Sequence, residues 1–155
     1  MPKKRNFKLK SGQTDFRHIR WAPVMNCVVM HKNKMLLVER SKGLHFYPGY
    51  WNGISGFLDD AEGLDEKVKE ELREELGIKP KDIVSIKLAE IFDQEEPKYK
   101  KTWIVHPVLV RVKTNNVSLD WEAKKFAWVS VQQAKKMKLL PGFAKVLKKV
   151  NAKRK

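Results

Sequence analysis

The stretch from Gly56 to Ile78 reads GFLDDAEGLDEKVKEELREELGI, and it decides the fold of the chain around it. Apolar residues recur every four positions from Leu64 to Leu76, which is the spacing of one buried helix face. Gly77 follows them, and glycine readily takes the left-handed conformation that ends a helix. The stretch therefore predicts a loop, a helix of about three turns and a second loop.

Nine acidic residues fall within this stretch, although the formal net charge of the chain is +15. At about 100° per residue, Glu71, Glu74 and Glu75 share one wedge of the helix beside its apolar face. Like charges at this spacing repel each other and weaken a helix. A hard cation such as Mg²⁺, which prefers oxygen ligands, would offset that repulsion. The alternative is a solvated charged face, because acidic runs are common on helices.

The length and composition indicate one domain with a substantial core in a chain of 155 residues. No apolar run is long enough to span a membrane, and no apolar segment follows the charges of the N-terminus. We therefore expect a cytoplasmic protein without a signal peptide. The single cysteine, Cys27, excludes an internal disulfide and is expected to be a buried free thiol.

The positive charge is concentrated at the two ends of the chain. Residues 1–20 carry seven Lys or Arg against one acid, and residues 123–155 carry eleven and no acid. Residues 21–122 carry fifteen against seventeen. Such ends attract phosphate-rich partners such as nucleotides, RNA or ribosomes. The alternative is a solubilising surface, because no aromatic-interleaved RNA-binding motif accompanies the charge.

Alternating apolar residues and turn residues predict the remaining elements. Strands are expected at 22–31, 35–40, 83–93, 102–112 and 126–129, loops at 41–55 and 94–101, and helices from a cap at Ser130 to about 137 and over 143–150. The first two strands read as a hairpin. Together these elements predict an α/β or α+β fold in a single domain, 22–150, between a basic N-terminal segment, 1–21, and a frayed basic tail, 151–155.

The acidic stretch resembles the box of the Nudix (MutT-like) family. That box reads Gly, five residues, Glu, seven residues, Arg-Glu, an aliphatic residue, any residue, Glu-Glu, any residue, Gly and an aliphatic residue. Eight of its nine defined positions are in register, namely Gly56, Glu62, Glu71, Leu72, Glu74, Glu75, Gly77 and Ile78. At the ninth, Glu70 stands where the family has Arg. The resemblance implies the Nudix fold, a mixed β-sheet sandwiched between α-helices.

The resemblance also implies a Mg²⁺-dependent hydrolase, with Mn²⁺ as a substitute, that cleaves the pyrophosphate bond of a nucleoside diphosphate linked to a group X. Glu71, Glu74 and Glu75 would bind the metal, and the backbone carbonyl of Ser55 would be a further ligand. Glu74, Glu75 and Glu122 are the candidate catalytic carboxylates, because Glu122 matches an acid before the late Trp-Val strand of the family. The alternative for Glu122 is a surface charge that offsets neighbouring lysines.

Three residues are candidates for substrate binding. Arg40 ends a strand where family members often have a substrate-facing Arg, so it is expected to contact a phosphate or to form a rim salt bridge. Tyr47 and Trp51 belong to an aromatic loop that either stacks on a base or covers the sheet. The expected partner is a nucleotide-type phosphorylated small molecule, with RNA contact through the basic ends, no membrane, and a monomeric or homodimeric protein.

Gly56, Glu62, Lys67 and Glu70 are assigned to the organisation of the box. In the family the Arg that Glu70 replaces pairs with carboxylates and fixes the catalytic helix and its loops. We hypothesise that Lys67 supplies part of the missing positive charge by a hydrogen bond to Glu71 or Glu70. The alternative is that the Lys67 ammonium occupies a metal position, and that the chain is a nucleotide- or RNA-binding module with weak or no catalysis.

Overall fold

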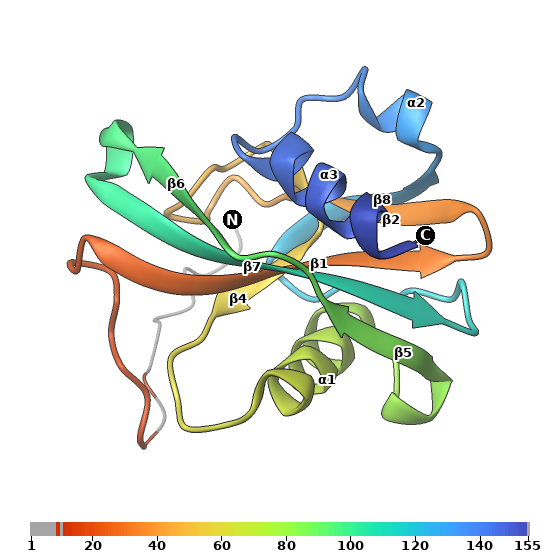
Figure 1. Ribbon diagram of the computed structural model, residues 1–155, viewed down its shortest axis with the longest axis horizontal. Coiled ribbons are helices and arrows are strands. Elements are labelled where there is room, and N and C mark those ends of the chain that lie inside the picture. Colours follow the sequence, from red (N-terminus) through yellow and green to blue (C-terminus); the bar gives the residue numbers. More distant parts are fainter. Residues whose placement is uncertain (1–8, 10, 155) are drawn as a thin grey trace.

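The computed structural model describes residues 9 and 11–154 and shows a mixed sheet between helices (Figure 1). Its strands are β1 Trp21–His31, β2 Lys34–Arg40, β3 Trp51–Asn52, β4 Ile54–Phe57, β5 Ile83–Leu88, β6 Phe92–Glu96, β7 Lys101–Val112 and β8 Ala123–Val129. Its helices are α1 Leu64–Leu76, α2 Val131–Ala134 and α3 Phe143–Arg154, with 3₁₀ turns at Pro80–Asp82 and Pro97–Tyr99. The strand order is β3-β2-β1-β7-β5, with β4 paired to β1, β6 to β7 and β8 to β2. The predicted mixed α/β sandwich is confirmed.

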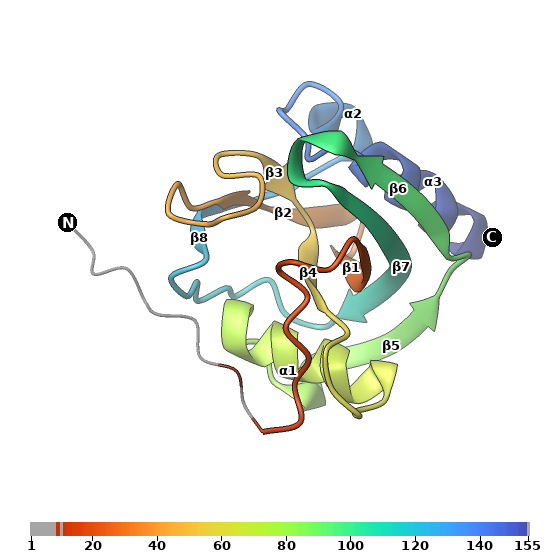
Figure 2. The same ribbon diagram turned by 90° about the vertical axis from the view of Figure 1, so that its left-hand side faces the viewer.

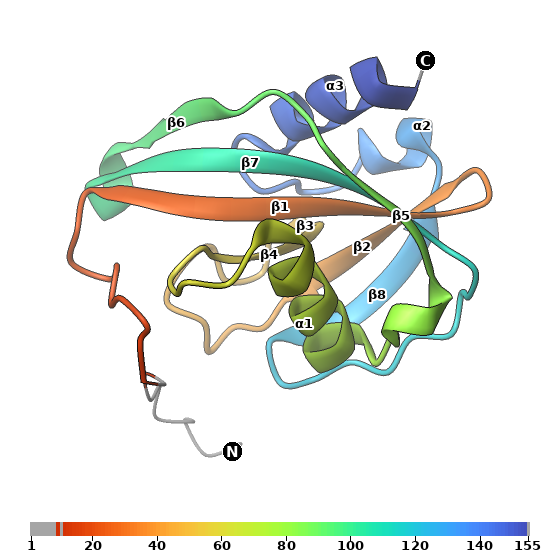
Figure 3. The same cartoon turned by 60° about the horizontal axis from the view of Figure 1, so that its bottom comes forward.

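The centre of the sheet is the parallel pair β1 and β7, in register from Trp21 with Thr102 to Met30 with Arg111. Both strands are buried on two faces, which explains their long apolar runs. One face packs against α1 and the other against α2 and α3 (Figure 3). Cys27 lies on the α1 side as a fully buried free thiol, as predicted.

The helix α1 forms where the four-residue spacing predicts it. Val68, Leu72 and Leu76 are fully buried against the sheet, and burial of each such side chain contributes roughly 1.5–3 kcal/mol. Gly77 ends the helix with φ of 68°, a left-handed conformation that suits glycine. The amide of Ile78 then donates to the carbonyl of Leu72 at 3.2 Å. The buried stripe and this cap fix which helix positions face the sheet.

The hairpin of β1 and β2 and the cap of α2 are also confirmed. Met30 pairs with Met35 across the hairpin. The Ser130 hydroxyl accepts from the amide of Gln133, whose side chain accepts from the amide of Ser130. This capping box satisfies two amides at the start of α2, which ends at Ala134, earlier than predicted.

Several predicted boundaries are wrong. The loop expected at 41–55 contains β3 and the start of β4, because backbone pairing with β2 and β1 forms these short strands without an apolar pattern. The strand expected at 83–93 is two strands, β5 and β6, which pair with opposite ends of β7. β6 also extends into the loop expected at 94–101, and β8 starts three residues before the expected 126. The tail expected at 151–155 continues α3 to Arg154.

The basic N-terminal segment expected at 1–21 is described in part. Residues 11–20, which we call the N-terminal strap, run beside the connection between β4 and α1 (Figure 2). Residues 1–8 and 10 lie outside the described residues, as does Lys155 of the predicted tail. Among the described helices, none has the length and apolar character needed to cross a bilayer.

Candidate active site

A small pocket lies where α1, β2, β4 and the segment before β8 meet. Its lining includes Arg40 from β2, Ser55 from β4, Glu75 from α1 and Glu122 from the segment before β8. The structure thus brings together predicted metal-binding, catalytic and substrate-binding residues. Asp120 also lines the pocket, and the sequence analysis did not include it. Its position two residues before Glu122 is the feature of the sequence that could have identified it.

The segment before β8 is anchored to the C-terminal end of α1. The amide of Ser118 donates to the carbonyl of Leu76 at 2.8 Å, and the amide of Asp120 donates to that of Glu75 at 3.3 Å. The amide of Glu122 donates to Oδ1 of Asp120 at 3.0 Å. The first two bonds occupy helix-end carbonyls that lack intrahelical partners. They also explain why Glu122, distant in sequence, lies against Glu75.

Glu71 and Glu75 are carboxylates in a region of low solvent access. Burial raises the pKa of Glu75 well above its ordinary value, and a hydrogen bond with Glu122 raises it further. Burial also raises the pKa of Glu71 to about 8, with the charge of Glu122 as the next cause and Lys67 acting in the opposite direction. Among the side chains that the structure describes, no Lys or Arg forms an ion pair with Glu71, Glu75 or Glu122. The repulsion among these three, which we call the inner carboxylates, is therefore not relieved by an ion pair there.

The inner carboxylates fit a hard divalent cation. They offer only carboxylate oxygens, which Mg²⁺ and Mn²⁺ accept as ligands, and their mutual repulsion favours a bound positive charge. The backbone beside Ser55 also approaches them closely. A Cβ on Gly56 would lie 3.2 Å from Cδ of Glu71, so the absence of a side chain there permits this approach. Glu71 and Glu75 are thus groups that suit a metal, and the role predicted for the Ser55 carbonyl stays a prediction.

Glu74 lies on the other side of the helix, although the sequence analysis placed it in the same wedge. It is exposed and lines a separate groove along α1 with Asp60, Glu62 and Glu70. We call these four the outer carboxylates. Oxygen atoms of Asp60, Glu62 and Glu70 lie within 4.8 Å of one another, and a hydrogen bond with Glu70 raises the pKa of Glu62. The roles predicted for Glu74 and Glu62 stay predictions.

Arg40 sits at the pocket wall with its Nε donating to the carbonyl of Phe46 at 3.0 Å. Burial lowers the pKa of Arg40, and the charges of Glu122 and Glu75 act in the opposite direction. No described side chain forms a salt bridge with Arg40, and its contact with a phosphate stays a prediction.

The aromatic candidates Tyr47 and Trp51 belong mainly to the packing of the sheet. Tyr47 is 6% exposed, and its hydroxyl accepts from Nε1 of Trp103 at 2.8 Å. This burial favours the packing alternative for Tyr47, because its ring lies in the core on the α3 side. Trp51 is partly buried there, with the Lys125 ammonium 5.6 Å from its ring centroid. Base stacking by Trp51 stays a prediction.

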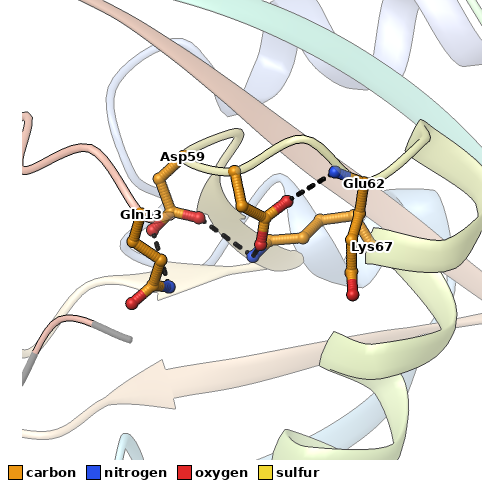
Figure 4. Close-up of polar contacts among 5 residues, drawn as sticks. Gln13, Asp59, Glu62 and Lys67 are labelled. Atoms are coloured by element: carbon orange, nitrogen blue, oxygen red, sulfur yellow. Dashed lines mark hydrogen bonds and ion pairs between the residues drawn. The ribbon is translucent and has the colours of Figure 1, made fainter. Parts of the chain in front are cut away.

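Lys67 does not have the partners that the sequence suggested. Its ammonium donates to Oδ1 of Asp59 at 3.0 Å and to Oδ2 of Asp60 at 3.1 Å (Figure 4). The expected bonds to Glu71 or Glu70 are wrong, because the connection between β4 and α1 folds back over the first turns of the helix and brings its own carboxylates to Lys67. Burial alone would lower the pKa of Lys67, but the two hydrogen bonds outweigh that effect and raise it.

A family model for the NUDIX domain matches residues 20–150, which is more than half of the chain. The chain belongs to the Nudix family. A relative, the NAD-capped RNA hydrolase NudC of Chromobacterium violaceum, is 38% identical over 72 residues, 46% of this chain but only 25% of that protein. The match thus spans a quarter of the relative's length. The predicted membership of the Nudix (MutT-like) family is confirmed.

Solved structures show the same Nudix fold. The NUDIX domain of Shewanella oneidensis NrtR, in a complex with ADP ribose, has a TM-score of 0.73 at 16% identity, covering 87% of this chain and 89% of that chain. The MutT protein of Methanosarcina mazei has a TM-score of 0.71 at 22% identity, covering 89% and 98%. At these identities the likeness concerns the fold.

A buried amide network holds the strand that precedes the Nudix box, and sequence reasoning missed it. Nδ2 of Asn26 donates to Oδ1 of Asn52 at 2.9 Å, and Nδ2 of Asn52 donates to the hydroxyl of Ser55 at 3.2 Å. A Cβ on Gly53 would lie 2.4 Å from the carbonyl oxygen of Cys27, so only glycine fits there. This network fixes Ser55 beside the pocket.

Proposed function

We propose that this protein is a divalent-cation-dependent Nudix pyrophosphohydrolase that cleaves a nucleoside diphosphate linked to a group X. The observation that carries the proposal is the single pocket where Glu75, Glu122 and Arg40 meet, with Glu71 close enough for Glu122 to raise its pKa. Membership of the Nudix family supports it. The names of the relatives add two substrate classes to test, ADP-ribose and NAD-capped RNA.

The metal-binding and phosphate-binding groups would divide that reaction between them. Mg²⁺ or Mn²⁺, held by Glu71, Glu75 and the Ser55 carbonyl, would neutralise charge on the substrate phosphates. Arg40 would bind phosphate oxygens through its Nη atoms, because its Nε is occupied by the Phe46 carbonyl. The oxygen of the attacking water bonds to phosphorus, the bond from phosphorus to the bridging oxygen breaks, and both products retain a phosphate.

Glu122 is our candidate for the base that accepts the proton of the attacking water. Its carboxylate lines the pocket with Arg40, whereas Glu74 is exposed in the groove of the outer carboxylates. A general base must reach the water from which it takes the proton. We place the attacking water in this pocket, where Glu122 would reach it and would become neutral on accepting the proton.

The proposal is tested by product release from a substrate panel with Mg²⁺ and then Mn²⁺. The panel holds ADP-ribose, dinucleoside polyphosphates, coenzyme A, NAD-capped RNA and oxidised nucleoside triphosphates. We expect metal-dependent turnover of at least one of these that Glu75→Gln abolishes and that Glu66→Gln, an exposed residue of α1, preserves. Absence of turnover with folded, metal-binding protein would leave a Nudix-fold binding module instead.

A second candidate function is contact with a phosphate-rich polyanion such as RNA. The last 33 residues, 123–155, carry eleven Lys or Arg and no acid. Part of this segment forms α2 and α3, which cover the face of the sheet opposite α1 (Figure 1). Exposed lysines on this face are Lys135, Lys136, Lys138, Lys145 and Lys148.

A salt titration of RNA binding tests this second function. Lys135→Ala with Lys136→Ala should weaken binding and lower the dependence on salt concentration, because each lost phosphate contact removes about 0.7 from the slope for a single strand. The matched control replaces Lys79 and Lys81, which are exposed beyond the end of α1. Equal effects of the two pairs would indicate general charge attraction and reject a specific face.

A further inference from the structure

Asp59 joins three separate parts of the chain (Figure 4). Its Oδ1 accepts from Nζ of Lys67 on α1 at 3.0 Å, and its Oδ2 accepts from Nε2 of Gln13 in the N-terminal strap at 3.3 Å. Its backbone carbonyl accepts from the amide of Thr14 at 2.6 Å. Asp59 is 8% exposed and Lys67 only 3%, so this contact lies inside the molecule.

The contact fixes the connection between β4 and α1 onto the helix. Lys67 stands one turn before Glu71, and its second bond, to Asp60 at 3.1 Å, ties a neighbouring residue to the same ammonium. Asp60 in turn accepts from the amide of Glu62 at 3.0 Å. Removal of one partner from such a buried pair leaves an uncompensated charge, which is strongly destabilising. The connection is therefore held where the two aspartates meet Lys67.

The strap is itself anchored to the sheet. The ring of Phe16 stacks on that of Phe57 with centroids 5.9 Å apart and planes 15° apart. The ammonium of Lys101, a residue 2% exposed in β7, donates to the carbonyls of Phe16 and Ile19. The amide of Thr102 donates to the carbonyl of Arg20 at 2.8 Å. The strap is thus bound to β7 through Lys101 and Thr102, and it contacts Asp59 through Gln13 and Thr14.

We propose that Gln13 and Thr14 of the strap are positioning residues of the Nudix site, acting through Asp59 and Lys67 on Glu71. The strap holds Asp59, and the bond from Asp59 to Lys67 holds the β4–α1 connection against the helix. Gly56 lies in β4, two residues before that connection, and packs so close to Glu71 that an added Cβ would lie 3.2 Å from its Cδ. A shift of the connection that reaches the end of β4 therefore changes the spacing between Glu71 and the backbone beside it.

The expected effect of the strap on turnover rests on the proposed function. Its expected effect on affinity for Mn²⁺ requires only that the site binds the metal. Supporting contacts behind a metal ligand typically change affinity or activity by about 10- to 100-fold when removed. Gln13 is a suitable position to test, because replacing glutamine by alanine changes no charge. A change in affinity for Mn²⁺ then reports position and not electrostatic attraction.

The test compares Gln13→Ala with a matched control in the same strap, Asp15→Asn, whose carboxylate pairs with the exposed Arg17 at 2.7 Å. Mn²⁺ affinity is measured by titration, and the exposure of amides 56–62 by hydrogen exchange. We expect about 10-fold weaker Mn²⁺ binding and faster exchange at 56–62 in Gln13→Ala, and values within about twofold of wild type in Asp15→Asn. Equal values in the two variants would overturn the proposal.

A double-mutant cycle separates the route through Asp59 from a general effect of the strap. If Gln13 acts through Asp59 and Lys67, the loss in Mn²⁺ affinity for Gln13→Ala with Lys67→Met is smaller than the sum of the single losses. Additive losses would reject that route. Should Lys67→Met fail to fold, Asp59→Asn takes its place, because the neutral amide removes the ion pair with Lys67 and keeps the size of the side chain.

Metal binding and turnover together distinguish a failure of the positioning role from a failure of the proposed function. If the wild type hydrolyses no substrate yet Gln13→Ala weakens Mn²⁺ binding, the proposed function fails and the positioning role stands. If the wild type is active and Gln13→Ala matches Asp15→Asn in affinity, exchange at 56–62 and kcat/KM, the function stands and the positioning role fails. Gln13→Glu, of equal size, should exceed Gln13→Ala in effect, because it sets a carboxylate against Asp59.

Discussion

The two sides of α1 carry the same residue type in two different environments. On one side Glu75 lines the pocket with Glu122, Glu71 lies close enough for the charge of Glu122 to raise its pKa, and burial raises the pKa of both helix residues. On the other side Glu70 and Glu74 line an open groove. The apolar stripe of the helix causes the difference, because Glu75 lies between buried Leu72 and Leu76 and is covered by the segment before β8.

The comparison shows that burial by neighbouring segments, and not the acidic sequence alone, gives the glutamates of α1 their raised pKa values. The charges in the open groove are screened by solvent, so that repulsion between them is weak. The inner carboxylates repel one another in a region of lower dielectric, so binding of a divalent cation there is more favourable than in the open groove. A substitution of an inner glutamate, compared with a matched substitution of an outer glutamate, therefore tests this difference.

The largest effect is expected from Glu75→Gln. Loss of one carboxylate ligand should lower kcat/KM about 10³-fold and weaken Mn²⁺ binding, because the amide keeps the shape but not the charge. Glu66→Gln on the outer side, where the carboxylate pairs with exposed Lys69 at 3.5 Å, should stay within about twofold. Steady-state kinetics and metal titration measure both. Similar losses in the two variants would remove the distinction between the sides.

The second effect is a dependence of metal-free stability on pH. The ordinary pKa of the Glu71 carboxyl is 4.5, and burial raises it to about 8 in the folded protein. Between these values the folded state binds a proton that the unfolded state has lost. The free energy of unfolding of the metal-free protein should therefore fall as pH rises from about 5 to about 8, by on the order of a few kcal/mol.

Denaturant unfolding at several pH values, with and without Mg²⁺, measures this slope. Mg²⁺ should flatten it, because the cation then offsets the charge of the ionised carboxylates. Glu71→Gln should reduce the slope in the absence of metal as well, since the amide does not titrate, and the raised pKa of Glu75 should account for the slope that is left. The matched outer variant, Glu66→Gln, should keep the slope of the wild type. A flat profile for the metal-free wild type would contradict the burial of the inner carboxylates.

Much of the fold was predictable because local sequence specifies it. The stripe at Val68, Leu72 and Leu76, the glycine at Gly77 and the cap at Ser130 all act within a few residues. The short strands β3 and β4 were not predictable, since they exist only through pairing with β2 and β1. The break between β5 and β6 likewise depends on the length of β7.

The candidate site was predictable only in its helical part. A helical wheel places Glu71, Glu74 and Glu75 together, but it carries no information on which side the segment before β8 will cover. Lys67 shows the same limit, because its partners Asp59 and Asp60 come from a loop that folds back. The contribution of the strap through Gln13 required contacts between segments 46 residues apart.

The third effect concerns the base. Glu122→Gln should lower kcat about 10²-fold with little change in Mn²⁺ affinity, because loss of a general base costs the chemical step. Glu74→Gln in the open groove should lower kcat by less. If Glu74→Gln has the larger effect, the base lies on the outer side and our assignment is wrong.

The smallest effect is expected from Glu70→Arg. At this position the added guanidinium would face Asp60 and Glu62, whose oxygens lie within 4.8 Å of that of Glu70. The exchange turns repulsion into attraction, so the free energy of unfolding should rise by about 1 kcal/mol at low salt and by less at high salt. If the substitution affects only the outer carboxylates, the free energy of unfolding rises and kcat/KM stays near that of the wild type. A large gain in turnover would instead show that the outer carboxylates limit the geometry of Glu71, and the two sides of α1 would then act as one unit.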